Sequence, residues 1–109
     1  MRILSQEVAP RPPFKIIPLG GLKFSIVDPE DFEYLNKFHW FAKKSSSRYY
    51  AVRKIHFDGK PKYLRMHRII AQTFPGFVTH HKNGNSLDNR KKNLENMKRG
   101  LHDMAHWKA

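Results

Sequence analysis

Short runs of turn-forming residues divide this 109-residue chain into brief segments, and this division limits what it can fold into. The turn signals are Gly20-Gly21, Ser45-Ser46-Ser47, Asp58-Gly59, Pro75-Gly76 and Asn83-Gly84-Asn85. A chain of this length forms one domain, or a main body with a small appendage, and buries only a modest core. Its 39% of hydrophobic residues still exceeds what a disordered chain carries.

Residues 14–76 follow a proline-rich leader, residues 1–13, and mix strand and helix patterns. We expect strands at residues 23–27, 40–43, 49–57 and 60–64, a helix that opens at Asp28, and a second helix at residues 66–74. Asp28 is the expected N-cap and Pro29 the first helical residue. The large apolar residues expected in the core are Phe24, Phe32, Leu35, Phe38, Trp40 and Phe57.

Residues 77–109 have a different order of patterns. The predicted elements are a strand at 77–81, a polar loop at 82–92, a strand at 93–97 and a closing helix at 101–108. This is a ββα order. We therefore predict an α+β fold, in which a small N-terminal αβ region with a basic sheet, residues 14–76, leads into a C-terminal ββα motif, residues 77–109.

The charge of the chain favours a polyanionic partner. Lysine and arginine number 21 against 9 acidic residues, which gives a net charge of +12 and points to nucleic acid before an anionic membrane. There is no cysteine, which excludes disulfides, thiolate metal sites and a cysteine nucleophile. No run is apolar enough to span a bilayer and the first ten residues lack a signal-peptide pattern, so the expected location is the cytoplasm.

Four histidines in the last thirty residues could form a metal site. His80 and His81 are adjacent on a predicted strand, so they point to opposite faces and serve different roles. His102 and His106 are four residues apart on a predicted helix and share one face. Three of these imidazoles around one divalent ion would leave the fourth free to act as a base. Each element alone also occurs by chance; their combination is what favours a site.

The same stretch resembles a known family. His80-His81, Asn93, His102 and His106, together with His81-Lys82-Asn83-Gly84-Asn85, Leu87-Asp88-Asn89-Arg90 and Asn93-Leu94, are similar to the motif of HNH (ββα-metal) endonucleases of the phage and homing type. Met66-His67-Arg68-Ile69-Ile70 and the segments around Ile17 and Asp31 resemble the family more loosely. The resemblance implies a ββα-metal nuclease that cuts or nicks double-stranded DNA.

The resemblance also implies a role for each motif residue. His81 matches the general base that activates water, with one ring nitrogen expected on a backbone carbonyl. Asn93 matches the motif asparagine, which pins the loop. His80, His102 and His106 match metal ligands. The implied cofactor is one divalent ion, magnesium or manganese, with zinc and nickel left open because imidazole suits them. Monomer and homodimer remain equally open.

Basic residues near the motif are candidates for contacts with DNA phosphates. Those in the predicted polar loop are Lys82, Arg90, Lys91 and Lys92, with Arg90 the first choice, and Arg65 and Arg68 belong with the basic residues of the predicted sheet. The predicted sheet adds Lys43, Lys44, Arg48, Arg53, Lys54, Lys60 and Lys62, with Asp58 as its only acid. For any single residue of the sheet, the polar face of a half-buried sheet is an equally good explanation, but as a set these residues favour DNA. For Arg90, Lys91 and Lys92 the alternative is a solvated loop, and phosphate contact is preferred because the loop borders the predicted site.

Other interpretations of these residues, and of the function, stay open besides the nuclease. His67 is expected to pack rather than react. Asp28, Glu30, Asp31 and Glu33 could suggest a two-metal site, but helix-start chemistry explains them better. The alternative function is a basic, non-catalytic DNA-binding protein with a structural metal. An RNA-binding module is the weaker alternative, because no aromatic ribonucleoprotein signature or glycine-clamp loop is present.

Overall fold

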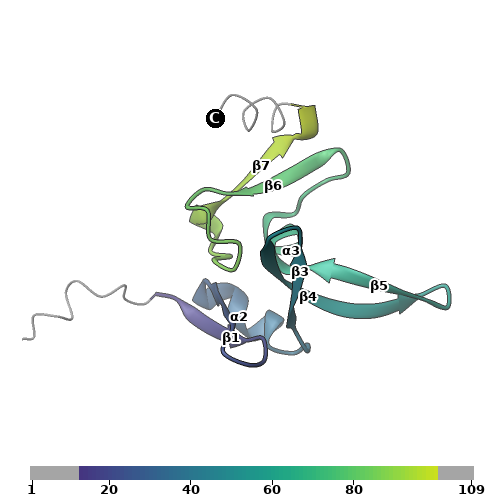
Figure 1. Cartoon of the computed structure of the whole chain (residues 1–109). Helices are drawn as coiled ribbons and strands as arrows, with labels where there is room; N and C mark the ends of the chain where they lie inside the picture. Colours follow the sequence, from purple (N-terminus) through teal and green to yellow (C-terminus); the bar gives the residue numbers. More distant parts are fainter. Residues whose placement is uncertain (1–12, 101–109) are drawn as a thin grey trace, which may run out of the picture.

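The computed structural model describes residues 13–100, and this part of the chain is mainly β-structure (Figure 1). Seven strands form three small antiparallel sheets. The strands are β1 (Lys15–Pro18) with β2 (Phe24–Val27), β3 (Phe41–Ser45) with β4 (Arg48–Phe57) and β5 (Lys60–Arg65), and β6 (Phe77–His81) with β7 (Leu94–Lys98). The helices are α2 (Pro29–Leu35) and α3 (Met66–Ala71), and η1 (Lys91–Asn93) is a single 3-10 turn.

The predicted fold class is therefore wrong. We expected an α+β fold with an αβ body and a ββα-metal motif, whereas the described residues hold seven strands and two helices of seven and six residues. The helix expected over 66–74 stops early, because Gln72 adopts a left-handed conformation (φ 52°) and its N–H caps the helix at Arg68 and Ile69. The expected closing helix and most of the leader lie outside the described residues.

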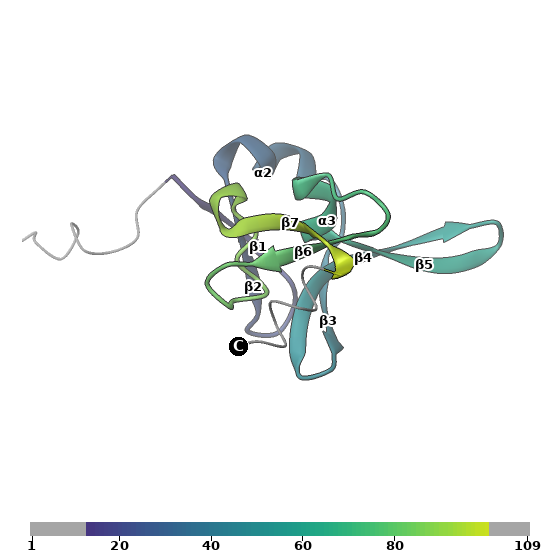
Figure 2. The same cartoon turned by 90° about the horizontal axis from the view of Figure 1, so that it is seen from above.

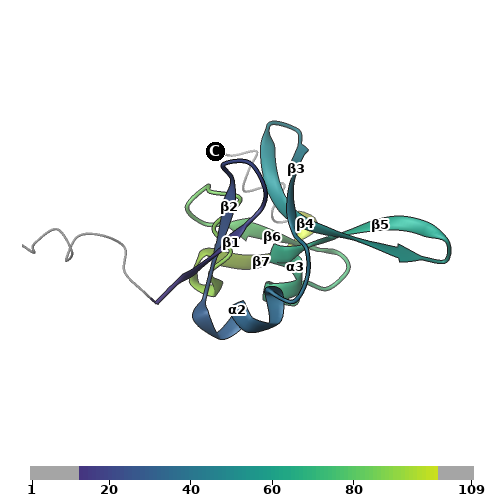
Figure 3. The same cartoon turned by 90° about the horizontal axis from the view of Figure 1, so that it is seen from below.

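The predicted strands are confirmed to within a few residues. Asp58 and Gly59 have φ angles of 58° and 76°, the positive values that a tight two-residue hairpin turn requires. The β4–β5 hairpin that they close extends away from the rest of the protein in all three views (Figures 1, 2 and 3). The strand β1 was missed, because its four residues alternate too briefly to give a pattern.

The core lies where the first two sheets meet both helices. Its buried members are Ile17, Leu19, Val27, Leu35, Trp40, Ala51 and Met66, with Phe32 and Phe38 packed against them. Trp40 donates its indole N–H to the carbonyl of Leu35 at 2.7 Å, which satisfies its one polar atom. Phe24 and Phe57 are 44% and 60% exposed, so their prediction as core residues is wrong.

The loop between β6 and η1, residues 82–90, is called the motif loop below, and it is bonded to the N-terminal hairpin. The Ile26 N–H donates to the Leu87 carbonyl at 2.9 Å, and the Asn89 N–H donates to the Ile26 carbonyl at 2.7 Å. Ile26 and Asp88 form an isolated parallel bridge. The motif loop thus continues the β1–β2 sheet and joins the N-terminal hairpin to the segment that follows β6.

Asp28 has a different task from the one predicted. It occupies the N-cap position of α2, but its side chain makes no capping hydrogen bond there. Its carboxylate instead accepts a 2.8 Å hydrogen bond from the backbone N–H of Lys91. This bond adds a second connection between the N-terminal region and the segment that follows the motif loop.

No helix within residues 13–100 is both long and apolar enough to cross a membrane.

Candidate functional site

A cavity of about 350 Å³ opens beside the end of β6. Its walls come from the motif loop and the strands β4 and β6, and the lining residues are Arg48, Tyr50, Val78, Thr79, His80, His81 and Gly84. Arg48 donates to the Gly84 carbonyl at 2.7 Å, and Ser86 donates to the Tyr49 carbonyl. These two bonds hold β4 against the motif loop and so fix the cavity walls.

His81, the predicted base, lies on the cavity wall with little exposed surface. It is the last residue of β6 and only 8% exposed. Its Nε2 atom is 2.8 Å from the side-chain oxygen of Asn89. We had expected a backbone carbonyl of the hairpin to anchor the ring, and a side-chain amide holds it instead.

Asn89 is a site residue that sequence reasoning missed. It is fully buried, and its side-chain nitrogen lies 3.1 Å from the hydroxyl of Ser25, also fully buried, on β2. Asn89 does lie within the quoted Leu87-Asp88-Asn89-Arg90 segment, so the motif contained a signal for it. Nothing in the sequence singled out Ser25.

His67 also belongs to the site, although we had expected it only to pack. Its ring meets the His81 ring edge to face, with centroids 5.1 Å apart, and Tyr50 lies against both rings at 5.4 and 6.2 Å. His67 is 6% exposed, and its Nδ1 atom is buried without a hydrogen-bond partner. His67 therefore packs in the interior, as expected, and also contacts the predicted base His81.

Burial keeps both imidazoles neutral. The pKa of His67 falls from 6.5 to about 3, first because burial disfavours the charged ring and then because His81 and two arginines lie nearby. Burial likewise lowers the pKa of His81, although the hydrogen bond to Asn89 and the charge of Asp88 oppose the shift. At neutral pH, His81 therefore has an unprotonated nitrogen that can accept a proton.

Asn93 ties the two ends of the motif loop together. Its side-chain oxygen accepts from the backbone N–H of Asn83 at 2.9 Å, and its side-chain nitrogen donates to the Asp88 carbonyl at 2.9 Å. The residue is 6% exposed. Both ends of the amide are engaged within the loop, so Asn93 shapes the site without lining the cavity.

Arg90, the first choice for a phosphate contact, is paired inside the protein. Its Nε and Nη2 atoms donate to the Asp88 carboxylate at 2.8 and 2.7 Å, and Asn83 donates to the same carboxylate at 2.9 Å. Burial alone would raise the pKa of Asp88, but these hydrogen bonds outweigh it and hold the pKa below its ordinary value. Arg90 therefore stabilises the motif loop in this structure.

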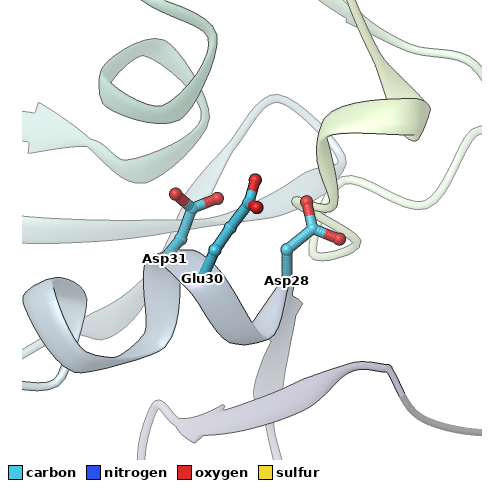
Figure 4. A group of neighbouring side chains, drawn as sticks. All are labelled: Asp28, Glu30 and Asp31. Atoms are coloured by element: carbon cyan, nitrogen blue, oxygen red, sulfur yellow. The ribbon is translucent and has the colours of Figure 1, made fainter.

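Lys91 and Lys92 lie near the start of α2 and do not line the cavity. The Lys91 ammonium is 2.6 Å from Glu30 and 3.2 Å from Asp31. Figure 4 shows the carboxylates of Asp28, Glu30 and Asp31 side by side at this helix start. Their oxygens are close enough to hold a cation, but Lys91 already supplies the positive charge there.

The remaining predicted DNA contacts fall into two groups. Arg68 donates to the carbonyl of Phe77 at 3.1 Å and of Phe74 at 3.5 Å, so it braces the start of β6. Arg65 and Lys82 are exposed at the end of β5 and the start of the motif loop. These two side chains are placed where a bound polyanion could reach them.

Of the three predicted metal ligands, His80 lies within the described residues. It is exposed and lines the cavity next to His81. His102 and His106 lie outside the described residues. An imidazole at this wall suits a divalent transition ion.

A basic face leads from the cavity along the three-stranded sheet. Directly paired residues in an antiparallel sheet share a face, and the pairs Lys43–Tyr50, Val52–Arg65 and Lys54–Tyr63 share the face on which Tyr50 reaches the two histidines. The Lys43 ammonium stacks on Tyr63 at 4.6 Å. We call this the basic face; its members are Lys43, Arg48, Tyr50, Lys54, His56, Tyr63 and Arg65.

Comparisons of the chain with models of known protein families, with curated proteins and with solved structures gave no match.

Proposed function

We propose that this protein is an endonuclease of the HNH type that hydrolyses phosphodiester bonds in double-stranded DNA. The observation that carries the proposal is the environment of His81. A neutral imidazole is held at one nitrogen by Asn89 and lies on the wall of an open cavity that also contains Arg48. A positioned base beside a cation is what hydrolysis of an anionic ester requires.

The chemistry follows from these groups. His81 takes a proton from a water molecule, and the resulting hydroxide attacks phosphorus. The bond from phosphorus to the 3′-oxygen breaks, which leaves a 5′-phosphate and a 3′-alkoxide. The alkoxide takes a proton from solvent water to become the 3′-hydroxyl, and the proton held by His81 returns to the hydroxide so formed. Arg48 donates a hydrogen bond to the Gly84 carbonyl beside the cavity, and from this position its charge attracts the scissile phosphate.

A divalent metal completes the proposal. His80 at the cavity would hold it together with His102 and His106, and imidazole donors fit manganese, zinc or nickel better than magnesium. Held there, a divalent ion would supply positive charge beside the phosphate and would stabilise the leaving oxygen. The acidic group at the start of α2 is not proposed as its site, because Lys91 occupies it.

The basic face supports DNA as the substrate. The strands β3, β4 and β5 contain no acidic residue, and the basic face shares Arg48 and Tyr50 with the cavity wall. A two-stranded ribbon fits the major groove of B-form DNA, and the β4–β5 hairpin extends from the body as such a ribbon (Figure 2). DNA bound along this face would place a phosphate near His81.

The test is nicking of a supercoiled plasmid with magnesium, manganese, zinc or EDTA. We expect metal-dependent nicking by the parent protein, loss of at least about 100-fold in His81→Ala, and unchanged activity in His39→Ala, an exposed histidine that does not line the cavity. Equal cutting by His81→Ala would refute the role of His81.

The alternative function has its own signature in this assay. Plasmid that stays intact with every metal, while the protein still retards it on a gel, would replace the nuclease with a non-catalytic DNA-binding protein.

A further inference from the structure

Two oxygens in the buried hydrogen-bond chain behind His81 determine where its protons lie. The Ser25 hydroxyl oxygen is 2.9 Å from the Leu87 carbonyl oxygen. Two oxygens at this distance need a proton between them, and only the hydroxyl has one to give. The Met66 sulfur, 3.4 Å from the same hydroxyl, is a weaker acceptor than a carbonyl oxygen, so the Ser25 hydroxyl donates to Leu87.

The direction of the next bonds follows. Since the Ser25 proton is directed to Leu87, its oxygen accepts from Asn89, 3.1 Å away, so the NH₂ end of the Asn89 amide faces Ser25. The oxygen end of the amide then faces His81 at 2.8 Å. An amide oxygen only accepts, so Nε2 of a neutral His81 carries the hydrogen.

We propose that Ser25 and Asn89 are positioning residues that hold His81 as the Nε2–H tautomer, so that Nδ1 is the nitrogen that accepts the proton of the attacking water. Ser25 and Asn89 are both fully buried. Bulk solvent therefore does not reach the Ser25 hydroxyl or the Asn89 amide in this structure. Chemically, a histidine base with the wrong tautomer cannot take the proton, whatever its position.

Ser25, which orients the Asn89 amide in this series of hydrogen bonds, lies far from His81 in the sequence. Ser25 is 64 residues from Asn89, and the Leu87 carbonyl also accepts from the backbone of Ile26. The tautomer is thus set by the docking of the motif loop on β2. The inference that Nδ1 acts as the base rests on the proposed nuclease function; the tautomer itself does not.

The experiment is long-range proton–nitrogen NMR of the ¹⁵N-labelled full chain at about pH 8, where a histidine with a lowered pKa is neutral. The His81 signals are assigned by their loss in His81→Ala. We expect a pure Nε2–H pattern in the parent protein and in Ser25→Thr, which keeps the hydroxyl. In Ser25→Ala the amide is free to rotate, and a substantial Nδ1–H population should appear.

Ser86→Ala is the matched control. Ser86 is also a buried serine that ties the motif loop to a neighbouring strand, but through the Tyr49 carbonyl and not through Asn89. This variant should keep the Nε2–H pattern even if its stability falls. An Nδ1–H pattern in the parent protein, or the parent pattern unchanged in a folded Ser25→Ala, would overturn the proposal.

Activity gives a separate measurement. If Ser25→Ala populates both amide orientations equally, half of the molecules hold the competent tautomer, and kcat for nicking falls about twofold with unchanged DNA affinity. Asn89→Ala removes the acceptor altogether and should lower kcat about 10- to 100-fold. A parent protein with the Nε2–H pattern but no nicking would refute the nuclease and leave the tautomer assignment in place.

Discussion

Acid should destabilise this protein through His67. The side chain is 6% exposed and its pKa in the folded protein is about 3, against 6.5 for a free histidine. Between these two values the unfolded chain binds a proton that the folded protein excludes. Stability is therefore fully present above about pH 6.5 and is lost as the pH falls toward 3.

The loss in the free energy of unfolding can be calculated from protonation of His67 in the unfolded chain. At about pH 5 the solution is 1.5 units below the ordinary pKa, and each unit corresponds to about 1.4 kcal/mol, so His67 alone should remove about 2 kcal/mol relative to about pH 7.5. His81 adds to this loss, because its pKa is also lowered by burial. Asp88 does not contribute in this window, since its pKa lies below 3.8.

Urea unfolding followed by the fluorescence of the buried Trp40 measures the effect. In His67→Leu, the loss between about pH 7.5 and about pH 5 should shrink by about 2 kcal/mol, while stability at the higher pH changes little because the lost Nδ1 has no hydrogen-bond partner. The control His56→Leu, at an exposed histidine, should behave as the parent protein. A loss in His67→Leu as large as that in the parent protein would refute the reasoning.

Further predictions concern charge. Arg90→Ala should lower the free energy of unfolding by about 2–4 kcal/mol in urea titrations, because it leaves the Asp88 carboxylate, 2% exposed, without its cation. Lys91→Ala should cost less than about 1 kcal/mol, since its ion pairs are solvated; equal losses would contradict the structural role of Arg90. For duplex DNA in EDTA, measured by fluorescence anisotropy, Lys54→Glu should raise Kd at least about fivefold more than Lys62→Glu on the opposite face of the same hairpin. Equal effects would indicate that net charge alone governs binding.

The local elements were readable from the sequence because their causes are local. Asp58-Gly59 permits positive φ angles, so the β4–β5 turn was predictable from two residues. Pro29 marks the start of α2 for the same kind of reason. The fold class was mispredicted because helix length depends on where tertiary packing ends each helix, and α3 stops at Ala71, three residues before the predicted end.

The residues of the candidate site were only partly predictable from the sequence. The histidine pair at the end of β6 was visible in the sequence, and the alternation of a strand predicted opposite faces for the two residues; in the structure His81 is buried and His80 exposed. The expectation for Arg90 missed its pairing with Asp88. A charged side chain looks the same in a sequence whether it faces solvent or a buried carboxylate.

Sequence alone thus determined the strong positive charge, the absence of cysteine, the positions of most strands and turns, and the pair of adjacent histidines that lines the cavity. Only the tertiary structure decided that His67 packs on His81, and that Ser25 and Asn89 orient the ring. The physical reason is that a sequence pattern depends only on residues that are close to one another along the chain. The partners of a buried polar group are set by which distant segments pack together, and here β2 and the motif loop meet across 64 residues of sequence.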